Sequence, residues 1–242
     1  MTMFDNVSID DHSKMAVPKA VREASNKMRD QILQADEFGV FLGSEEDLLN
    51  QLEISRPTFR QVARLLEQEQ LLTIKRGPGG GFFSQKPSFS GVTHQASVCL
   101  VANKAKFSDL HSVGRALSIE LAVQAANNPD QQLRAKPMAY IGERAKKGVD
   151  VSDLSLWVQT TYEFTRVVLE VANNPALDMF IHITRKFADQ LASNLRWIEP
   201  ENIALYQNHQ LKVADAIKQG DADYAALAAA RMNDLITGEP TV

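Results

Sequence analysis

Arginine recurs at every fourth residue in one segment of the chain, at Arg56, Arg60 and Arg64. Residues four apart share a face of an α-helix, and the apolar residues Val62 and Leu66 fall on the opposite side of the same helix. An exposed guanidinium can contact guanine O6 and N7 or a phosphate oxygen. The spacing therefore predicts a helix that presents arginines to DNA. The alternative is a helical hairpin whose arginines are only solvated.

A second basic element follows this helix. Lys75 and Arg76 stand beside a run of glycines and one proline at residues 77–81, which begins with Gly77. Glycine lets a backbone turn sharply and approach a phosphate closely. The run is flanked by Ile74 and Phe82, which are typical strand residues. We expect a small β-wing with a basic tip.

The two helices expected to position these side chains each begin with a residue that favours a helix N-terminus. Ser44 can cap one helix, with Asp47 three residues later as a capping box. Ser55 can cap the next, and Pro57 falls in its first turn, where a missing N–H costs nothing. The order is helix, turn, arginine-bearing helix and wing. That order is typical of a winged helix-turn-helix, whose second helix lies in the major groove.

This segment resembles the N-terminal signature of the GntR family of bacterial transcription regulators. The resemblance rests on thirteen positions, Leu42, Ser44, Glu45, Leu48, Leu52, Ile54, Ser55, Arg56, Thr58, Arg60, Leu66, Leu71 and Leu72. The wing from Arg76 to residue 81 is similar to the form found in the FadR-like branch. The chain departs from the pattern at Glu46, where the family has a DNA-contacting arginine, and at Glu53, where it has a glycine. The expected DNA-binding residues are Ser55, Arg56, Thr58, Arg60, Arg64, Lys75, Arg76 and Gly77.

Composition sets limits on the class of protein. The length of 242 residues and a hydrophobic fraction of 44% suggest two modest domains. The net charge is −4, but residues 54–86 carry six basic against two acidic side chains, a local surplus suited to DNA. One cysteine, a polar N-terminus and the lack of a long apolar segment predict a soluble, cytoplasmic protein without a membrane partner.

The rest of the chain predicts helices and no strand after the wing. Three stretches in it resemble the FCD effector-binding domain: 109–117 with Glu120, Phe164 with 172–177, and 208–217 with Gly220 and Asp221. The resemblance implies an antiparallel bundle of six or seven helices that binds a small molecule and forms a homodimer. The expected organisation is a winged helix-turn-helix domain at 1–86, a linker at 87–93 and an FCD-like domain at 94–242.

Many FCD domains hold a divalent metal, and the resemblance shows where its ligands would fall here. The aspartate and first histidine correspond to Thr161 and Thr165, and the later histidines to Gln210 and a position near Met232. His209 lies one residue before Gln210, the position at which the family pattern would place the histidine ligand. These side chains do not suit a divalent cation, so we expect no metal or other cofactor. Asp178 and His182 form a separate i, i+4 pair, whose metal-site reading stays open beside that of an ordinary surface pair.

Without a metal, the effector must be held by shape and polar groups. Arginines there could pair with a carboxylate or phosphate, so a carboxylate or acyl compound is the expected kind of effector, although any one of them could equally form a surface salt bridge. The aromatic candidates could line the cavity or simply fill the core. The candidate pocket residues are Arg115, Trp157, Thr161, Tyr162, Thr165, Arg166, Arg185, His209 and Gln210.

The sequence as a whole predicts a DNA-binding transcription regulator. The expected form is a dimeric repressor whose affinity for a double-stranded DNA operator changes when a metabolite binds the helical domain. A dimer that binds DNA without responding to any ligand is the alternative. An enzyme is disfavoured, because the chain has no recognisable nucleophile–histidine–acid order and no paired catalytic carboxylates.

Overall fold

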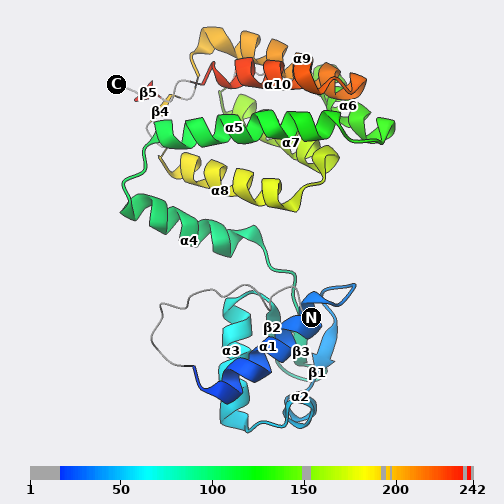
Figure 1. Cartoon of the computed structure of the whole chain (residues 1–242), viewed down its shortest axis with the longest axis vertical. Coiled ribbons are helices and arrows are strands. Elements are labelled where there is room, and N and C mark those ends of the chain that lie inside the picture. The colour runs from blue at the N-terminus through cyan, green and yellow to red at the C-terminus, as the bar shows by residue number, and fades with distance from the viewer. Residues whose placement is uncertain (1–16, 149–153, 192–194, 197, 237–238, 241–242) are drawn as a thin grey trace. The chain divides into compact units, whose positions relative to one another are not determined.

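The structure is a computed structural model, and it describes residues 17–148, 154–191, 195–196, 198–236 and 239–240. The chain divides into two compact units, 1–91 and 92–242. The first is a small helical domain with a sheet, and the second is a helical bundle (Figure 1). The predicted mainly helical fold class, with a winged helix-turn-helix head and a helical domain, is confirmed.

Three helices form the body of the first unit, hereafter the head: α1 (Lys19–Leu33), α2 (Glu45–Leu52) and α3 (Arg56–Gln68). Ser44 caps α2 in the predicted capping box, because its hydroxyl accepts from the Asp47 N–H while Asp47 accepts from the Ser44 N–H. The helices enclose an apolar core centred on Phe59, Val62 and Leu66 of α3. This core fixes which face of α3 remains outside.

The sheet of the head has three strands in the order β1-β3-β2. The wing strands β2 (Leu72–Lys75) and β3 (Gly81–Ser84) pair antiparallel, from Leu72 opposite Ser84 to Lys75 opposite Gly81. Strand β1 (Phe41–Gly43), which pairs with β3 ahead of α2, was not predicted. Phe82 packs edge-on against Phe59 with ring centroids 4.9 Å apart, so the wing packs against the N-terminal turn of α3.

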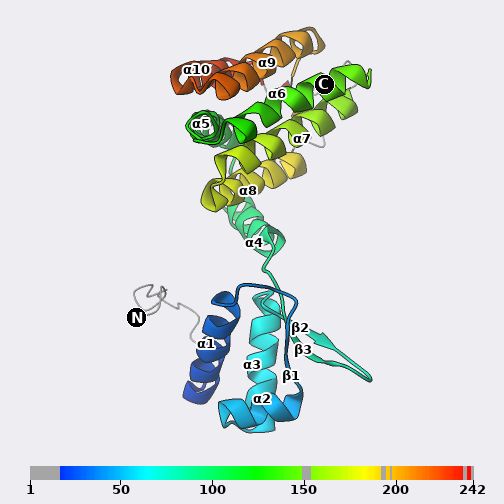
Figure 2. The same cartoon turned by 90° about the vertical axis from the view of Figure 1, so that its right-hand side faces the viewer.

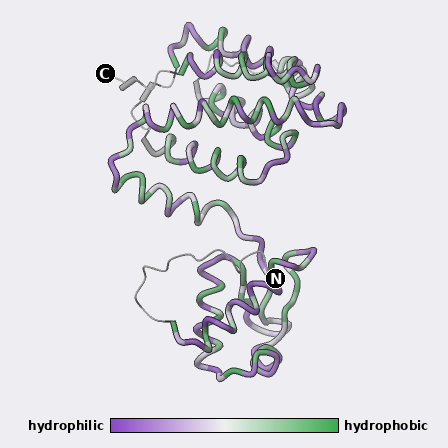
Figure 3. Tube along the Cα trace, viewed as in Figure 1, coloured by the Kyte–Doolittle hydropathy of each residue, from purple (hydrophilic) through white to green (hydrophobic). Residues whose placement is uncertain are grey.

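Helix α4 (Phe89–Ala102) follows the wing and begins within the range 87–93 that the sequence suggests as a linker. It contains no charged residue, and its C-terminal half is coloured as hydrophobic in Figure 3. Val98 and Val101 are nevertheless exposed. Cys99, the single cysteine of the sequence, is also exposed on this helix.

In the described part of the second unit, six further helices build the bundle, and α5 lies between the α9–α10 pair and the α7–α8 pair (Figures 1 and 2). The main core of the bundle combines alanines with valine, leucine and isoleucine side chains, and the small alanines let the helices pack close together. None of the described helices is both long and apolar enough to cross a membrane. The six helices are α5 (Phe107–Ala126), α6 (Gln131–Lys146), α7 (Leu154–Ala172), α8 (Pro175–Leu191), α9 (Ile203–Gln219) and α10 (Ala222–Asn233).

The expectation of no strand after the wing is wrong. Leu195–Arg196 (β4) pairs antiparallel with Glu239–Pro240 (β5). Two-residue strands are too short to show an alternating pattern, so the sequence gives no signal for them. They bring the chain after α8 and the chain after α10 together.

Candidate functional sites

The exposed face of α3 carries the three arginines expected from their spacing. Arg56, Arg60 and Arg64 are all exposed, while Phe59 and Val62 of the same helix are buried. Three guanidinium groups therefore stand on one side of a helix whose other side is anchored in the head core. Such a helix can present cations to a DNA groove without changing its own packing.

The first turn of α3 is held by its own side chains. Ser55 accepts a hydrogen bond from the Thr58 N–H at 3.5 Å, and the two hydroxyls lie 2.9 Å apart. Their first role is to cap the helix, and Ser55 remains exposed at its N-terminus.

The wing tip is a tight turn over residues 77–80. The Gly80 N–H donates to the Gly77 carbonyl at 2.8 Å, with Pro78 and Gly79 (φ +72°) between them, as in a type II turn. Lys75 and Arg76 are exposed beside it, and the Lys75 ammonium lies 4.2 Å from the centre of the Phe83 ring. The structure therefore places Lys75, Arg76 and the exposed Gly77 together at the tip of the wing.

Two carboxylates lie near the arginine surface. Glu45 is 3.9 Å from the Arg56 guanidinium in a pair that is exposed on both sides. Glu46, at the position where the GntR pattern has arginine, is exposed in the first turn of α2. Exposed pairs of this kind contribute little to stability, so Arg56 can exchange Glu45 for a phosphate at small cost.

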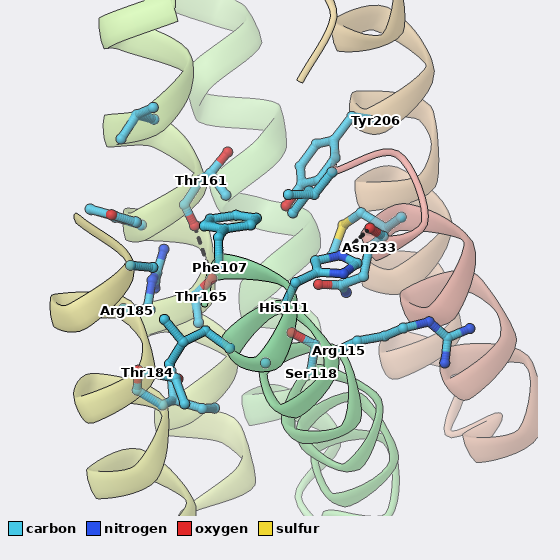
Figure 4. A pocket seen from close by; sticks show the side chains of 18 of the residues that line it. Phe107, His111, Arg115, Ser118, Thr161, Thr165, Thr184, Arg185, Tyr206 and Asn233 are labelled. Carbon is cyan, nitrogen blue, oxygen red and sulfur yellow. Dashed lines mark hydrogen bonds between the residues drawn. The ribbon is translucent and has the colours of Figure 1, made fainter. Parts of the chain in front are cut away.

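The second unit contains a cavity of about 130 Å³ between α5, α7, α8, α9 and α10. Figure 4 shows labelled lining residues from each of these helices. The cavity is lined by Phe107, Leu110, His111, Gly114, Arg115, Ser118, Trp157, Val158, Thr161, Tyr162, Thr165, Ile181, Thr184, Arg185, Ala188, Tyr206, Met232, Asn233 and Ile236.

Six of the nine predicted pocket residues line this cavity. Arg185 lies with its guanidinium carbon 3.8 Å from the centre of the Tyr162 ring. Thr165 donates to the Thr161 carbonyl at 3.0 Å, one turn below on α7. Trp157 is 3% exposed and packs edge-on against Tyr206, with ring centroids 5.2 Å apart.

Arg115 also lines the cavity but is already paired. Its Nε donates to Asp234 at 2.6 Å, and this bond lowers the pKa of the Asp234 carboxyl and raises that of Arg115. In Figure 4 its side chain extends toward α10, away from Arg185. Next to it, a His111 ring nitrogen lies 3.0 Å from the Asn233 carbonyl. The two contacts join α5 to the end of α10.

The other three predicted pocket residues lie outside this cavity. Arg166 is exposed on α7. Gln210 is buried, and its side-chain oxygen accepts from the Arg144 guanidinium at 2.9 Å. His209 is 8% exposed within the bundle and does not line the cavity.

The positions that correspond to metal ligands do not form a suitable donor set. Thr161, Thr165 and Met232 line the cavity, but hydroxyls and a thioether are poor ligands for a divalent cation. Gln210 is engaged by Arg144. No three His, Cys, Asp or Glu side chains of the described residues gather as a metal site would require. His182 pairs with its i−4 neighbour Asp178 at 2.9 Å on the bundle surface, an ordinary helix pair.

Comparison with known proteins gives the class of this bundle. Residues 109–234 match the model of the FCD domain. The chain belongs to the FCD-domain family. The match spans more than half of the chain and includes most of the residues that line the cavity.

Relatives and solved structures agree with this assignment. The chain is 24% identical to the HTH-type transcriptional repressor NanR of Salmonella newport, over 86% of this chain and 80% of that protein. It is 26% identical to NanR of Cronobacter sakazakii, with the same coverage. The fold is similar to that of Streptococcus agalactiae GntR, with a TM-score of 0.63, 17% identity and coverage of 87% of this chain and 95% of that one. The predicted class, a GntR-type transcription regulator with an FCD domain and not an enzyme, is confirmed.

Proposed function

We propose that the chain is a cytoplasmic repressor that binds a DNA operator as a homodimer and releases it when a small molecule enters the FCD cavity. The observation that carries the DNA-binding part is the arginine face of α3. Arg56, Arg60 and Arg64 are exposed together on a helix fixed by its own buried face, with the basic wing on the same small domain. The repressor names of the relatives support the direction of regulation.

Each head contributes two kinds of contact in this proposal. Arg56 and Arg60, near the N-terminus of α3, read base edges or hold phosphates, as the first turns of a recognition helix do. Arg64, Lys75 and Arg76 bind the backbone, and Gly77 lets the wing approach it closely. Ser55 and Thr58 add phosphate contacts beside their capping role.

The regulatory part of the proposal is a shift between arrangements of the two heads. A ligand that binds the bundle better in one arrangement lowers the population that matches the spacing of a palindromic operator. The cavity is lined by several helices of the bundle, so its occupant can bias their packing. The donor set at the cavity supports an effector bound without a metal ion.

A regulator that no longer responds to any ligand is the second candidate. It is favoured by the loss of metal-binding side chains at Thr161 and Thr165. The cavity supports the sensor instead, because protein interiors are close-packed and voids larger than a water molecule are few. A compound that both stabilises the protein and releases it from DNA would support the ligand-responsive repressor over the unresponsive regulator.

The test uses a DNA duplex selected from a random library by binding to the full chain. Replacing Arg56 and Arg60 with alanine should weaken binding to the selected duplex by about tenfold or more for each residue, since a base-contacting arginine is worth about 1–3 kcal/mol. Arg22, an exposed arginine on α1, serves as the matched control, and Arg22→Ala should leave binding unchanged. Undiminished affinity in the double variant would refute the proposed surface.

A further inference from the structure

We propose that Gln70 is a positioning residue for operator binding, because its side chain ties the start of α4 to the head and so limits the half-site spacings that a dimer can bind. This inference rests on the proposed function and names a residue that sets its preference for one spacing. It draws on a strained backbone, a series of hydrogen bonds that ends at α4, and a close packing contact.

Gln70 has an unfavourable backbone conformation just after α3. Its φ is +58°, in the left-handed region that glycine adopts freely but a residue with a Cβ does not. Such a conformation persists only where the surrounding structure fixes it, and it is common at functional sites. The preceding residue, Glu69, is held by Arg29 of α1, whose Nε and Nη2 donate to its carboxylate at 2.9 and 2.7 Å. The backbone of Gln70 therefore extends from a fixed point of the head.

The chain that leaves the wing is hydrogen-bonded back to the chain that enters it. Just after β3, the Gln85 N–H donates to the Leu71 carbonyl at 2.9 Å. The Thr73 hydroxyl donates to the side-chain oxygen of Gln85. At the end of this series, Gln70 Oε1 accepts from the N–H and the hydroxyl of Ser88, at 3.1 and 2.6 Å. Ser88 directly precedes α4, so the last bonds of the series fall at the start of that helix.

The first turn of α4 also leaves room for the Gln70 side chain. A side chain at Gly91 would place its Cβ 2.9 Å from Gln70 Nε2, closer than such contacts normally come. Gln70 itself is half-buried. One side chain thus binds the residue before α4 through its oxygen and lies against the first turn of α4 through its nitrogen.

This attachment matters because α4 crosses the boundary between the two units, which lies between residues 91 and 92. In the proposed dimer, binding of the second head is intramolecular, and its effective concentration depends on the stiffness of the connection. A connection held at its start narrows the range of positions open to each head. Affinity then rises for half-sites at the matching distance and falls for others. Gln70 acts through α4 without contacting DNA.

The test compares three duplexes by fluorescence anisotropy: the selected duplex, the same duplex with two base pairs inserted at its centre, and a single half-site. Two inserted base pairs rotate one half-site relative to the other by about 70°. The full-length parent should lose about 30-fold in affinity on insertion, whereas Gln70→Ala should lose about threefold. Gln70→Ala should bind the selected duplex about tenfold less tightly than the parent, and the single half-site equally tightly.

Three further variants separate positioning from other effects. Gln70→Glu keeps an acceptor for both Ser88 donors, so it should keep the spacing preference of the parent. Gln68→Ala is the matched control, since Gln68 is an exposed glutamine at the end of α3, and it should also behave as the parent. Gln70→Gly adopts the left-handed conformation without steric cost, so it should resist urea better than Gln70→Ala. It should nevertheless lose the spacing preference to at least the same extent.

Amide hydrogen exchange tests the attachment without DNA. The Ser88 N–H, which donates to Gln70, should exchange about tenfold faster in Gln70→Ala than in the parent, and at the parent rate in Gln70→Glu and Gln68→Ala. Unchanged exchange at Ser88 in Gln70→Ala would overturn the inference. An equal loss on insertion in the parent and Gln70→Ala, or a relaxed spacing preference in Gln68→Ala, would overturn it as well.

The selected duplex separates this inference from the proposed function. Failure of the parent to bind any DNA duplex refutes the regulator proposal and with it the role of Gln70. Normal DNA binding with the same spacing dependence in Gln70→Ala refutes only the role of Gln70.

Discussion

His209 shows how burial and nearby cations together favour one charge state of a single residue. It lies on α9 with 8% of its surface exposed, and its Nδ1 has no hydrogen-bond partner among the described residues. Desolvation, helped by Lys212 and Arg231, lowers its pKa below the usual value. The folded protein therefore holds this ring neutral at pH 7, in a place where a proton would be unfavourable.

The stability of the bundle should consequently depend on pH. Because the folded pKa of His209 is below the unfolded value of about 6.5, the unfolded chain takes up the proton first as the pH falls. The contribution of His209 to stability is full above that value and is lost as the pH drops below it. We expect the melting temperature to fall between pH 7.5 and pH 5.5, as measured by circular dichroism.

The variant His209→Gln isolates this effect, since glutamine stays neutral throughout. Its melting temperature should vary less over the same pH range than that of the parent. Equal pH dependence in the parent and His209→Gln would contradict the assignment.

At the residue scale, the sequence predicts where a side chain lies only when its own helix determines that position. Helical phase places Thr161 and Thr165 toward the cavity, whatever the side chain, and the structure finds both there. Phase also separates Arg166 from Thr165 by about 100°, enough to move it to the surface. The engagement of Gln210 by Arg144 depends on a helix 66 residues away in sequence, so no local pattern could predict it.

At the scale of an element, the turn between α2 and α3 stores backbone strain. Glu53 ends α2 in the left-handed conformation, with φ 55°. Left-handed geometry costs a residue with a Cβ about 1–2 kcal/mol, and glycine avoids this cost. The departure from the family pattern at Glu53 thus places an ordinary side chain where the turn favours glycine.

Replacing Glu53 with glycine should therefore stabilise the head. We expect a gain of about 1 kcal/mol in its free energy of unfolding, after allowing for the greater freedom of glycine in the unfolded chain. The measurement is urea unfolding followed by far-ultraviolet circular dichroism. Glu53→Ala also removes the carboxylate but retains the Cβ, so it should leave the stability nearly unchanged. A gain of the same size in both variants would attribute the effect to charge instead.

The elements differ in how much of them could be predicted from the sequence. Helix caps are local, so Ser44, Ser55 and Pro57 correctly indicate the starts of α2 and α3. Strand β1 and the β4–β5 pair have two or three residues each and carry no alternation to detect. The cavity residues Phe107, His111, Ser118 and Asn233 were missed because their direction depends on how α5 packs against α10.

For the whole molecule, the charge distribution argues that two heads bind together. Residues 54–86 hold only six basic side chains against two acidic ones, while the net charge of the chain is −4. We expect a solution mass of twice 26.9 kDa by light scattering. We also expect DNA affinity to fall by about 10³–10⁵ between 50 and 200 mM salt, as it does for proteins that neutralise about 6–10 phosphates in all.

A lysine variant separates phosphate binding from other salt effects. Lys75→Gln removes one phosphate-binding cation from each head, so the salt slope should become shallower by about one per head, with little change in preference among DNA sequences. Lys19, exposed on α1 and paired with Glu23 on its own helix, gives the comparison in Lys19→Gln. A monomeric mass with a shallow salt slope would contradict joint binding by two heads.

The exposed thiol of Cys99 makes the proposed rearrangement directly measurable. It is the single cysteine of the sequence, on the helix that carries the chain from the head into the bundle. A thiol-reactive spin label therefore attaches at one known position without any engineering of the protein. In the proposed dimer, the two labels define one distance, and electron paramagnetic resonance can compare it with and without DNA bound.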